Sequence, residues 1–166
     1  MKVEYLNAFV QAGCEVINEL TGIEFKKEKI FLNAYPIPSY DVSIIAGITG
    51  FITGQVVYSL QGTTAETLVV KWLKKINPEK KEKLIKSGIS EISNMITGRS
   101  TSLLQKKNKI LRVTPPSIIT GDKFKIEFIK LKTIVVSMQS EIGPLEISLA
   151  LKESEEDELL KEESNE

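Results

Sequence analysis

The chain has 166 residues, of which 42% are hydrophobic and 27% are charged, as is usual for one soluble globular domain. It contains no histidine. This absence excludes a Ser-His-Asp or Cys-His nucleophile, a histidine phosphorelay and a histidine-based zinc or iron site. Carboxylates, amides, hydroxyls and lysines are the groups left for chemistry, which argues against a transition-metal enzyme.

The cellular compartment is indicated by the cysteine content and by what the sequence lacks. Cys14 is the only cysteine, so an intrachain disulfide is impossible and a reducing compartment is favoured. The apolar runs are far too short to span a bilayer, and the first residues include an acid and no apolar block. We therefore expect a cytoplasmic protein that does not interact with membranes.

Charge is unevenly distributed, although the formal net charge is zero. Residues 152–166 contain two lysines and eight acidic residues, a net charge of −6, so residues 1–151 carry +6. After Leu151 the only large apolar residues are Leu159 and Leu160. We expect one domain over residues 1–152 and a solvated, disordered acidic tail over residues 153–166.

The first half of the chain predicts one helix, two paired strands and a second helix. Helical spacing of apolar residues, β-prone runs and the positions of Gly and Pro define these elements. In chain order we expect a helix over 3–20 ended by Gly22, a segment over 24–30 that is irregular or a first strand, a loop or sheet edge over 35–38, strands over 43–48 and 51–60 joined by a turn at 49–50, and a helix from Thr63 or Thr64 that Asn77-Pro78 breaks.

The second half predicts a long helix and then further strands. The expected elements are a helix over 78–106, strands over 112–114, 125–130, 133–138 and 145–151, and turns at 121–122 and 143–144. Because short turns join the strands, most pairing should be antiparallel. The predicted fold class is α+β, a mostly antiparallel sheet with helices packed on one face.

The long helix carries the residues of most interest for chemistry. At about 100° per residue, Ile85, Ile89, Ile92, Ile96 and Leu103 share one side, which we expect to face the core. Glu91 and Asn94 lie roughly opposite, in company with small or polar residues at Ser87, Gly98, Thr101 and Gln105. Small neighbours let another macromolecule approach closely. A glycine within a helix costs up to about 1 kcal/mol relative to alanine, so Gly98 calls for a functional explanation.

A bare Glu-x-x-Asn pattern is common, and by itself it favours a solvated helix face on which Glu and Asn fall by accident. Three segments in order are more specific. SEISNMITG at 90–98 resembles the signature helix of the CheC/CheX/FliY phosphatases, and IAGITGFITGQVVYSL at 45–60, continuing into TAETL at 64–68, and VTPPSIITG at 113–121 also resemble CheX proteins. The similarity runs from about Val3 to Lys152. Ser90, where relatives often have Gly, and Arg99, where we expect a smaller residue, are departures.

The resemblance implies a CheX-like phosphatase that hydrolyses the aspartyl phosphate of a CheY-like response regulator in bacterial chemotaxis. In this scheme Asn94 orients the attacking water and Glu91 pairs with a lysine of the receiver. No cofactor of its own is implied, since the magnesium belongs to the receiver. The resemblance further implies a homodimer joined at sheet edges. The alternative is a non-catalytic receiver-binding adaptor or a flagellar switch-associated module of the same fold.

Two other features have more ordinary explanations. Glu15 and Asn18 repeat the Glu-x-x-Asn pattern in the first helix. CheC-type relatives have two such sites and CheX-type members one, and we favour chance here because small neighbours are lacking. The lysines at 80, 81, 83 and 86 fit a solvated helix face better than a phosphate site, and without interleaved aromatic residues they do not indicate nucleic-acid binding.

Overall fold

The computed structural model describes residues 2–33, 37–105, 109–128 and 131–154. The helices are α1 (Val3–Thr21), α2 (Gly62–Leu73) and α3 (Lys81–Leu104), with a 3₁₀ turn, η1 (Pro78–Lys80), before α3. The strands are β1 (Lys26–Asn33), β2 (Ile37–Pro38), β3 (Val42–Gly50), β4 (Ile52–Leu60), β5 (Leu111–Val113), β6 (Ser117–Thr120), β7 (Lys125–Ile126), β8 (Thr133–Ser140) and β9 (Gly143–Glu153).

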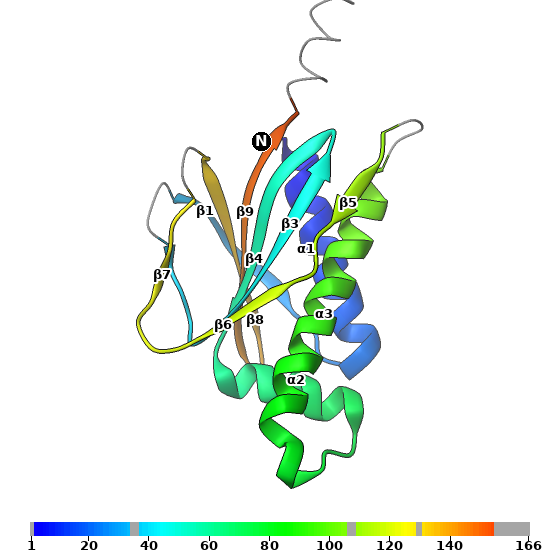
Figure 1. The fold of residues 1–166 in the computed structure, drawn as a ribbon, viewed down its shortest axis with the longest axis vertical. Helices are drawn as coiled ribbons and strands as arrows, with labels where there is room; N and C mark the ends of the chain where they lie inside the picture. The colour runs from blue at the N-terminus through cyan, green and yellow to red at the C-terminus, as the bar shows by residue number, and fades with distance from the viewer. Residues whose placement is uncertain (1, 34–36, 106–108, 129–130, 155–166) are drawn as a thin grey trace, which may run out of the picture.

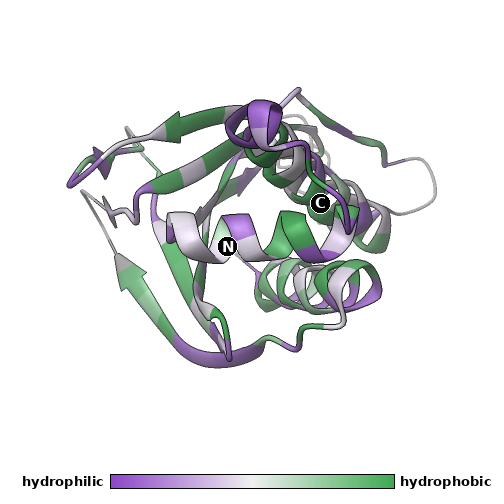
Figure 2. Cartoon of the chain, turned by 90° about the horizontal axis from the view of Figure 1, so that it is seen from below, coloured by the Kyte–Doolittle hydropathy of each residue, from purple (hydrophilic) through white to green (hydrophobic). Residues whose placement is uncertain are grey.

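The main sheet is antiparallel throughout the described residues. Its strand order is β1-β8-β9-β4-β3-β5, with β6 also pairing with β3, while β2 and β7 form a separate two-stranded sheet. The three helices lie together on one side of the main sheet (Figure 1), and the view from below shows the strands curving around them (Figure 2). The predicted α+β class, with helices packed on one face, is therefore confirmed.

Successive side chains along the strands point to opposite faces of the main sheet, and this alternation produces two hydrophobic clusters. In β4, Val56, Tyr58 and Leu60 face the helices and join the main core, and in β9 Leu145, Ile147, Leu149 and Leu151 do the same. The intervening positions form a smaller cluster on the other face, where Phe128 and Ile126 cover Val57, Val135 and Ala150. No helix in the described part of the chain is long and apolar enough to cross a bilayer.

Several predicted elements agree closely with the structure. The first helix ends at Gly22, which adopts a positive φ of 72° and donates its N–H to the carbonyl of Asn18. The β3–β4 hairpin forms around Gly50 as expected. Of the two alternatives for residues 24–30, an irregular segment or a first strand, the structure shows the strand, β1, and Pro38 belongs to a short edge strand. Residues 35–36 of that predicted segment and most of the acidic tail, residues 155–166, lie outside the described residues.

Other boundaries were wrong. Of the strand predicted over 125–130, the described residues 125–128 form a strand only at Lys125–Ile126, where they pair with the two-residue strand β2; residues 129–130 lie outside the described residues. Gly143-Pro144 is not a turn but the start of β9, since the turn falls on residues 141–142. The long helix begins at Lys81 rather than Pro78, because the first three residues form the 3₁₀ turn, and it ends at Leu104. Strand β6 was not predicted.

Candidate functional site

Helix α3 carries Glu91 and Asn94. Its 3₁₀ entry is capped by Asn77, whose side-chain oxygen accepts the backbone N–H of Glu79 at 3.0 Å, and Pro78 occupies the first turn. Ile89, Ile92 and Ile96 are buried in the main core. With that side of the helix fixed, Glu91 is exposed and Asn94 is half-buried on the other side.

The Glu91 and Asn94 side chains make no hydrogen bond or ion pair with any residue that the structure describes. Since they lie three residues apart on one helix, the carboxylate and the carboxamide project from adjacent turns of the same surface. A carboxylate accepts hydrogen bonds and binds cations, whereas a carboxamide both donates and accepts at any physiological pH. The pair can therefore bind a cationic side chain and orient a water molecule.

The small-residue surroundings of this pair are partly as predicted. Ser87 and Gln105 are exposed, and a Cβ at the half-buried Gly98 would meet no atom within 4 Å. Thr101, predicted on this open face, is instead buried, and Leu103, predicted in the core, is 48% exposed. Both errors have one cause: α3 packs against β5 near its C-terminal end, so the buried side rotates toward Thr101 and Leu104.

Two contacts hold α3 in place around the candidate pair. Gly88 allows α2 to approach, because a Cβ there would lie 2.7 Å from Val69 Cγ1. The buried Tyr58 hydroxyl is 2.8 Å from Thr97 Oγ1. Since Thr97 already donates to the Ser93 carbonyl, Tyr58 must be the donor to Thr97. The turn next to Asn94 is thereby bonded to β4.

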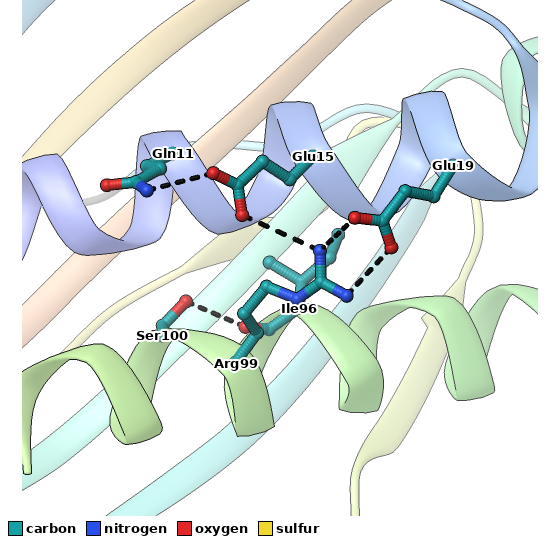
Figure 3. A network of polar contacts seen from close by, with 6 residues as sticks. All are labelled: Gln11, Glu15, Glu19, Ile96, Arg99 and Ser100. Atoms are coloured by element: carbon teal, nitrogen blue, oxygen red, sulfur yellow. Dashed lines mark hydrogen bonds and ion pairs between the residues drawn. The ribbon is translucent and has the colours of Figure 1, made fainter.

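The repeated pattern in α1 has different surroundings from the pair in α3. Helices α1 and α3 lie side by side and run in opposite directions (Figure 1), and Arg99 reaches across to α1 (Figure 3). Its guanidinium donates to both oxygens of Glu19, at 2.7 and 2.8 Å, and lies 3.6 Å from Glu15. Gln11 also donates to Glu15, at 2.8 Å. The Glu15 carboxylate is therefore already engaged, whereas that of Glu91 has no partner in the part of the chain that the structure describes.

These contacts also explain the unexpected residue at position 99. The sequence marks Arg99 as a departure but does not reveal its partners, because only the packing of α1 on α3 brings them together. The sequence feature that could have indicated these partners is the row of Gln11, Glu15 and Glu19, which lie four residues apart in α1. The hydrogen bond from Arg99 lowers the pKa of Glu19. Burial, aided by the nearby Glu15, raises the pKa of the Cys14 thiol.

The described residues hold no group of three or more cysteine, aspartate or glutamate side chains placed to bind a metal ion. Within the candidate site the ligand-type groups are the single carboxylate of Glu91 and the amide of Asn94. Resident Mg²⁺ or Zn²⁺ sites generally need more protein ligands than this pair offers. The surface of α3 therefore presents an exposed carboxylate at Glu91 and a half-buried amide at Asn94.

Solved structures share this fold. A CheC-like superfamily protein from Shewanella sp. PV-4 superposes with a TM-score of 0.81 at 23% identity, covering 92% of this chain and 99% of that one. The CheX–CheY–BeF3–Mg²⁺ complex from Borrelia burgdorferi gives a TM-score of 0.77 at 22% identity, covering 92% of this chain and 100% of the matched chain. At these identities the likeness establishes the fold, which is the one that CheX- and CheC-type proteins adopt.

The sequence comparisons define the family. The family described as "Chemotaxis phosphatase CheX" matches residues 42–139. The CheY-P phosphatase CheX of Thermotoga maritima is 31% identical over 128 residues, which cover 76% of this chain and 82% of that protein. This chain belongs to the CheX family of chemotaxis phosphatases, and its enzyme class is accordingly that of a phosphatase.

Proposed function

We propose that this chain hydrolyses the aspartyl phosphate of a CheY-type response regulator, with Asn94 orienting the attacking water and Glu91 docking the receiver. One observation carries the residue assignment: Glu91 and Asn94 lie one turn apart on the outer side of α3, with side chains unengaged by other described residues. The substrate class is supported by the Thermotoga maritima relative, a CheY-P phosphatase, and by the Borrelia burgdorferi complex of CheX with CheY.

The chemistry requires no nucleophile from this chain. Water attacks phosphorus in line, the bond from phosphorus to the aspartyl oxygen breaks, and the products are the free aspartate carboxylate and inorganic phosphate. The carboxamide of Asn94 accepts a hydrogen bond from the water and holds it in line, without having to change its protonation state. Positioning of this kind supplies a large part of catalysis in phosphoryl transfer.

Glu91 has a separate role in this scheme. Its exposed carboxylate pairs with a lysine beside the phosphoaspartate and fixes the position of α3 over the receiver's site. We expect no cofactor in this chain itself, because in this scheme the magnesium ion belongs to the receiver. The Borrelia burgdorferi complex of CheX with CheY contains Mg²⁺ and beryllofluoride. A reaction of this type would take place in the cytoplasm, where the single Cys14 stays reduced.

The decisive experiment follows phosphate release from a phosphorylated CheY-type receiver, with and without the purified chain. The wild-type chain should accelerate release, and Asn94→Ala should abolish the acceleration. Because Asn94 is half-buried on a helix surface, its replacement should change the free energy of unfolding by only about 0.5 kcal/mol. Asn18→Ala, which makes the same change in the repeated pattern of α1, is the matched control and should keep full activity.

Undiminished turnover by a folded Asn94→Ala variant would refute the catalytic role. Binding of the phosphorylated receiver without any acceleration by the wild type would instead favour the alternative function, a non-catalytic adaptor or flagellar switch-associated module.

We further propose a homodimer that joins through β1. This strand is the longest sheet edge among the described strands, and three consecutive apolar residues on it are exposed: Ile30, Phe31 and Leu32 at 47%, 41% and 68%. An exposed apolar edge strand is a ready template for pairing with another chain. Helix α3 packs at the other end of the sheet, against β3, β5 and β6, so the Glu91 and Asn94 surface would remain open in such a dimer.

A further inference from the structure

One end of the molecule carries a marked excess of positive over negative charge. Residues 71–87 contain seven lysines and two glutamates, a net charge of +5, while residues 1–151 together carry +6. These lysines lie at the end of α2, in the connection to α3 and in the first turns of α3: Lys71, Lys74, Lys75, Lys80, Lys81, Lys83 and Lys86. We call this set the lysine end.

Most of this charge is not neutralised. Lys81 pairs with Glu66, and Lys86 pairs with Glu82 at 2.7 Å. The other five lysines are exposed and form no ion pair with any described residue. Figure 1 places the lysine end at the bottom of the molecule, with the end of β9, where the acidic segment begins, at the top. Intramolecular pairing within the described structure therefore leaves the positive surface free.

The lysine end adjoins the candidate site on the same helix. Lys83 precedes Asn94 by eleven residues, which corresponds to roughly 16 Å along the axis and a rotation of about 20°. Ser87 and Glu91 lie between them on the same side. A typical interface of about 800 Å² per partner has a radius of about 16 Å. A receiver centred on Asn94 would therefore have Lys83 at the rim of its footprint.

We propose that the lysine end is an electrostatic docking surface for the phosphorylated receiver; this inference rests on the proposed function. The receiver's surface beside its phosphoaspartate must be anionic, because Mg²⁺ is held by carboxylate oxygens and the phosphoryl group adds negative charge. Rim charges of opposite sign accelerate association and make it dependent on salt, with little effect on dissociation.

The test measures association of the full chain with a CheY-type receiver loaded with Mg²⁺ and beryllofluoride, so that hydrolysis is not involved. Lys80→Glu with Lys83→Glu should slow association about tenfold at low salt and flatten its salt dependence, while the dissociation rate changes by less than about twofold. Both residues are exposed, and a glutamate in the first turn of α3 is favourable for the helix, so folding should be retained.

The matched control is Lys125→Glu with Lys132→Glu. It makes the same change in net charge, at exposed positions next to the hydrophobic cluster on the face of the sheet away from the helices. This variant should associate like the wild type. Equal slowing in both double variants would overturn the inference, since net charge alone would then explain the effect. An unchanged association rate in the lysine-end variant would also overturn the inference.

Failure of the proposed function gives a different pattern. If the Asn94→Ala variant still hydrolyses the phosphoaspartate while the lysine-end variant associates slowly, the catalytic role fails and the docking surface stands. If the wild type neither binds the receiver nor hydrolyses its phosphate, both fail. Normal receiver association by the lysine-end variant, together with lost binding to phosphatidylglycerol vesicles, would assign the surface to a membrane and overturn the proposal.

Discussion

At the scale of single residues, the chain presents the same Glu-x-x-Asn pattern twice in different electrostatic surroundings. Glu15 is held by Gln11 and lies 3.6 Å from Arg99, whereas Glu91 is exposed and unengaged within the described structure. A glutamate carboxylate that already pairs with an arginine of its own chain is less available to form an ion pair with a lysine of the receiver. The two positions therefore form a natural pair of test and control.

Glu91→Gln should weaken binding of a beryllofluoride-loaded receiver by about tenfold, because it removes the negative member of the proposed interfacial charge pair. Glu15→Gln should leave the affinity unchanged. Titration of the receiver with each variant measures this. Equal losses from both substitutions would mean that both helices contact the receiver, and no loss from Glu91→Gln would contradict the docking role.

Gly98 offers a second test at this scale, in which stability and binding should move in opposite directions. A Cβ at Gly98 meets nothing within 4 Å, so Gly98→Ala should raise the free energy of unfolding, by up to about 1 kcal/mol. The added methyl group would lie on the proposed receiver-binding surface, so the affinity for the receiver should fall. Denaturant unfolding and receiver titration check the two effects, and a variant that gains stability without losing affinity would show that close approach is not required there.

At the scale of elements, the helices and the strands β3, β4, β8 and β9 could be predicted because their apolar spacing is strong and Gly or Pro marks most of their ends. The mixed sequence of residues 24–30 left β1 open as an irregular segment or a strand. Among the short strands, β5 was predicted to within one residue, but β6 was not predicted at all. Strand β6 follows Pro115-Pro116, a sequence that favours loops, and becomes a strand only because it pairs with β3. Helical periodicity alone predicted that Glu91 and Asn94 share one surface of α3. It did not predict where that surface ends, because Thr101 is buried by the packing of β5, which is distant in sequence, against α3.

Strand β9 gives a pH-dependent prediction at this scale. Glu146 pairs in register with Ser59 and Ser137, and burial raises its pKa. The folded state then holds this proton at pH values where the unfolded chain has released it, so the contribution of Glu146 to stability falls as pH rises from about 4.3 through the raised pKa. Glu146→Gln should be more stable than the wild type at pH 7, and the gain should vanish below about pH 4. Denaturant unfolding at both pH values measures this, and an equal gain at each would contradict it.

At the scale of the whole molecule, the arrangement separates the surfaces that the proposals need. The exposed apolar residues of β1 lie at one end of the sheet order, and α3 packs at the other. A two-fold pairing through β1 would use the same strand from both copies and place two Glu91/Asn94 surfaces facing outward. Binding of a receiver to one copy would then not obstruct binding to the other.

The dimer can be tested with one substitution at each edge of the sheet. Leu32 is 68% exposed on β1, so Leu32→Glu should cost the monomer fold little while introducing a charge into the proposed interface. Sedimentation at micromolar concentration should show a dimer for the wild type and a monomer for Leu32→Glu, with phosphatase activity per chain retained. Ile110→Glu is the matched control, because Ile110 is 59% exposed just before β5 at the opposite edge. A wild type that sediments only as a monomer would refute the dimer, and dissociation by Ile110→Glu alone would move the interface to the β5 edge, close to α3, where it would compete with the receiver for space.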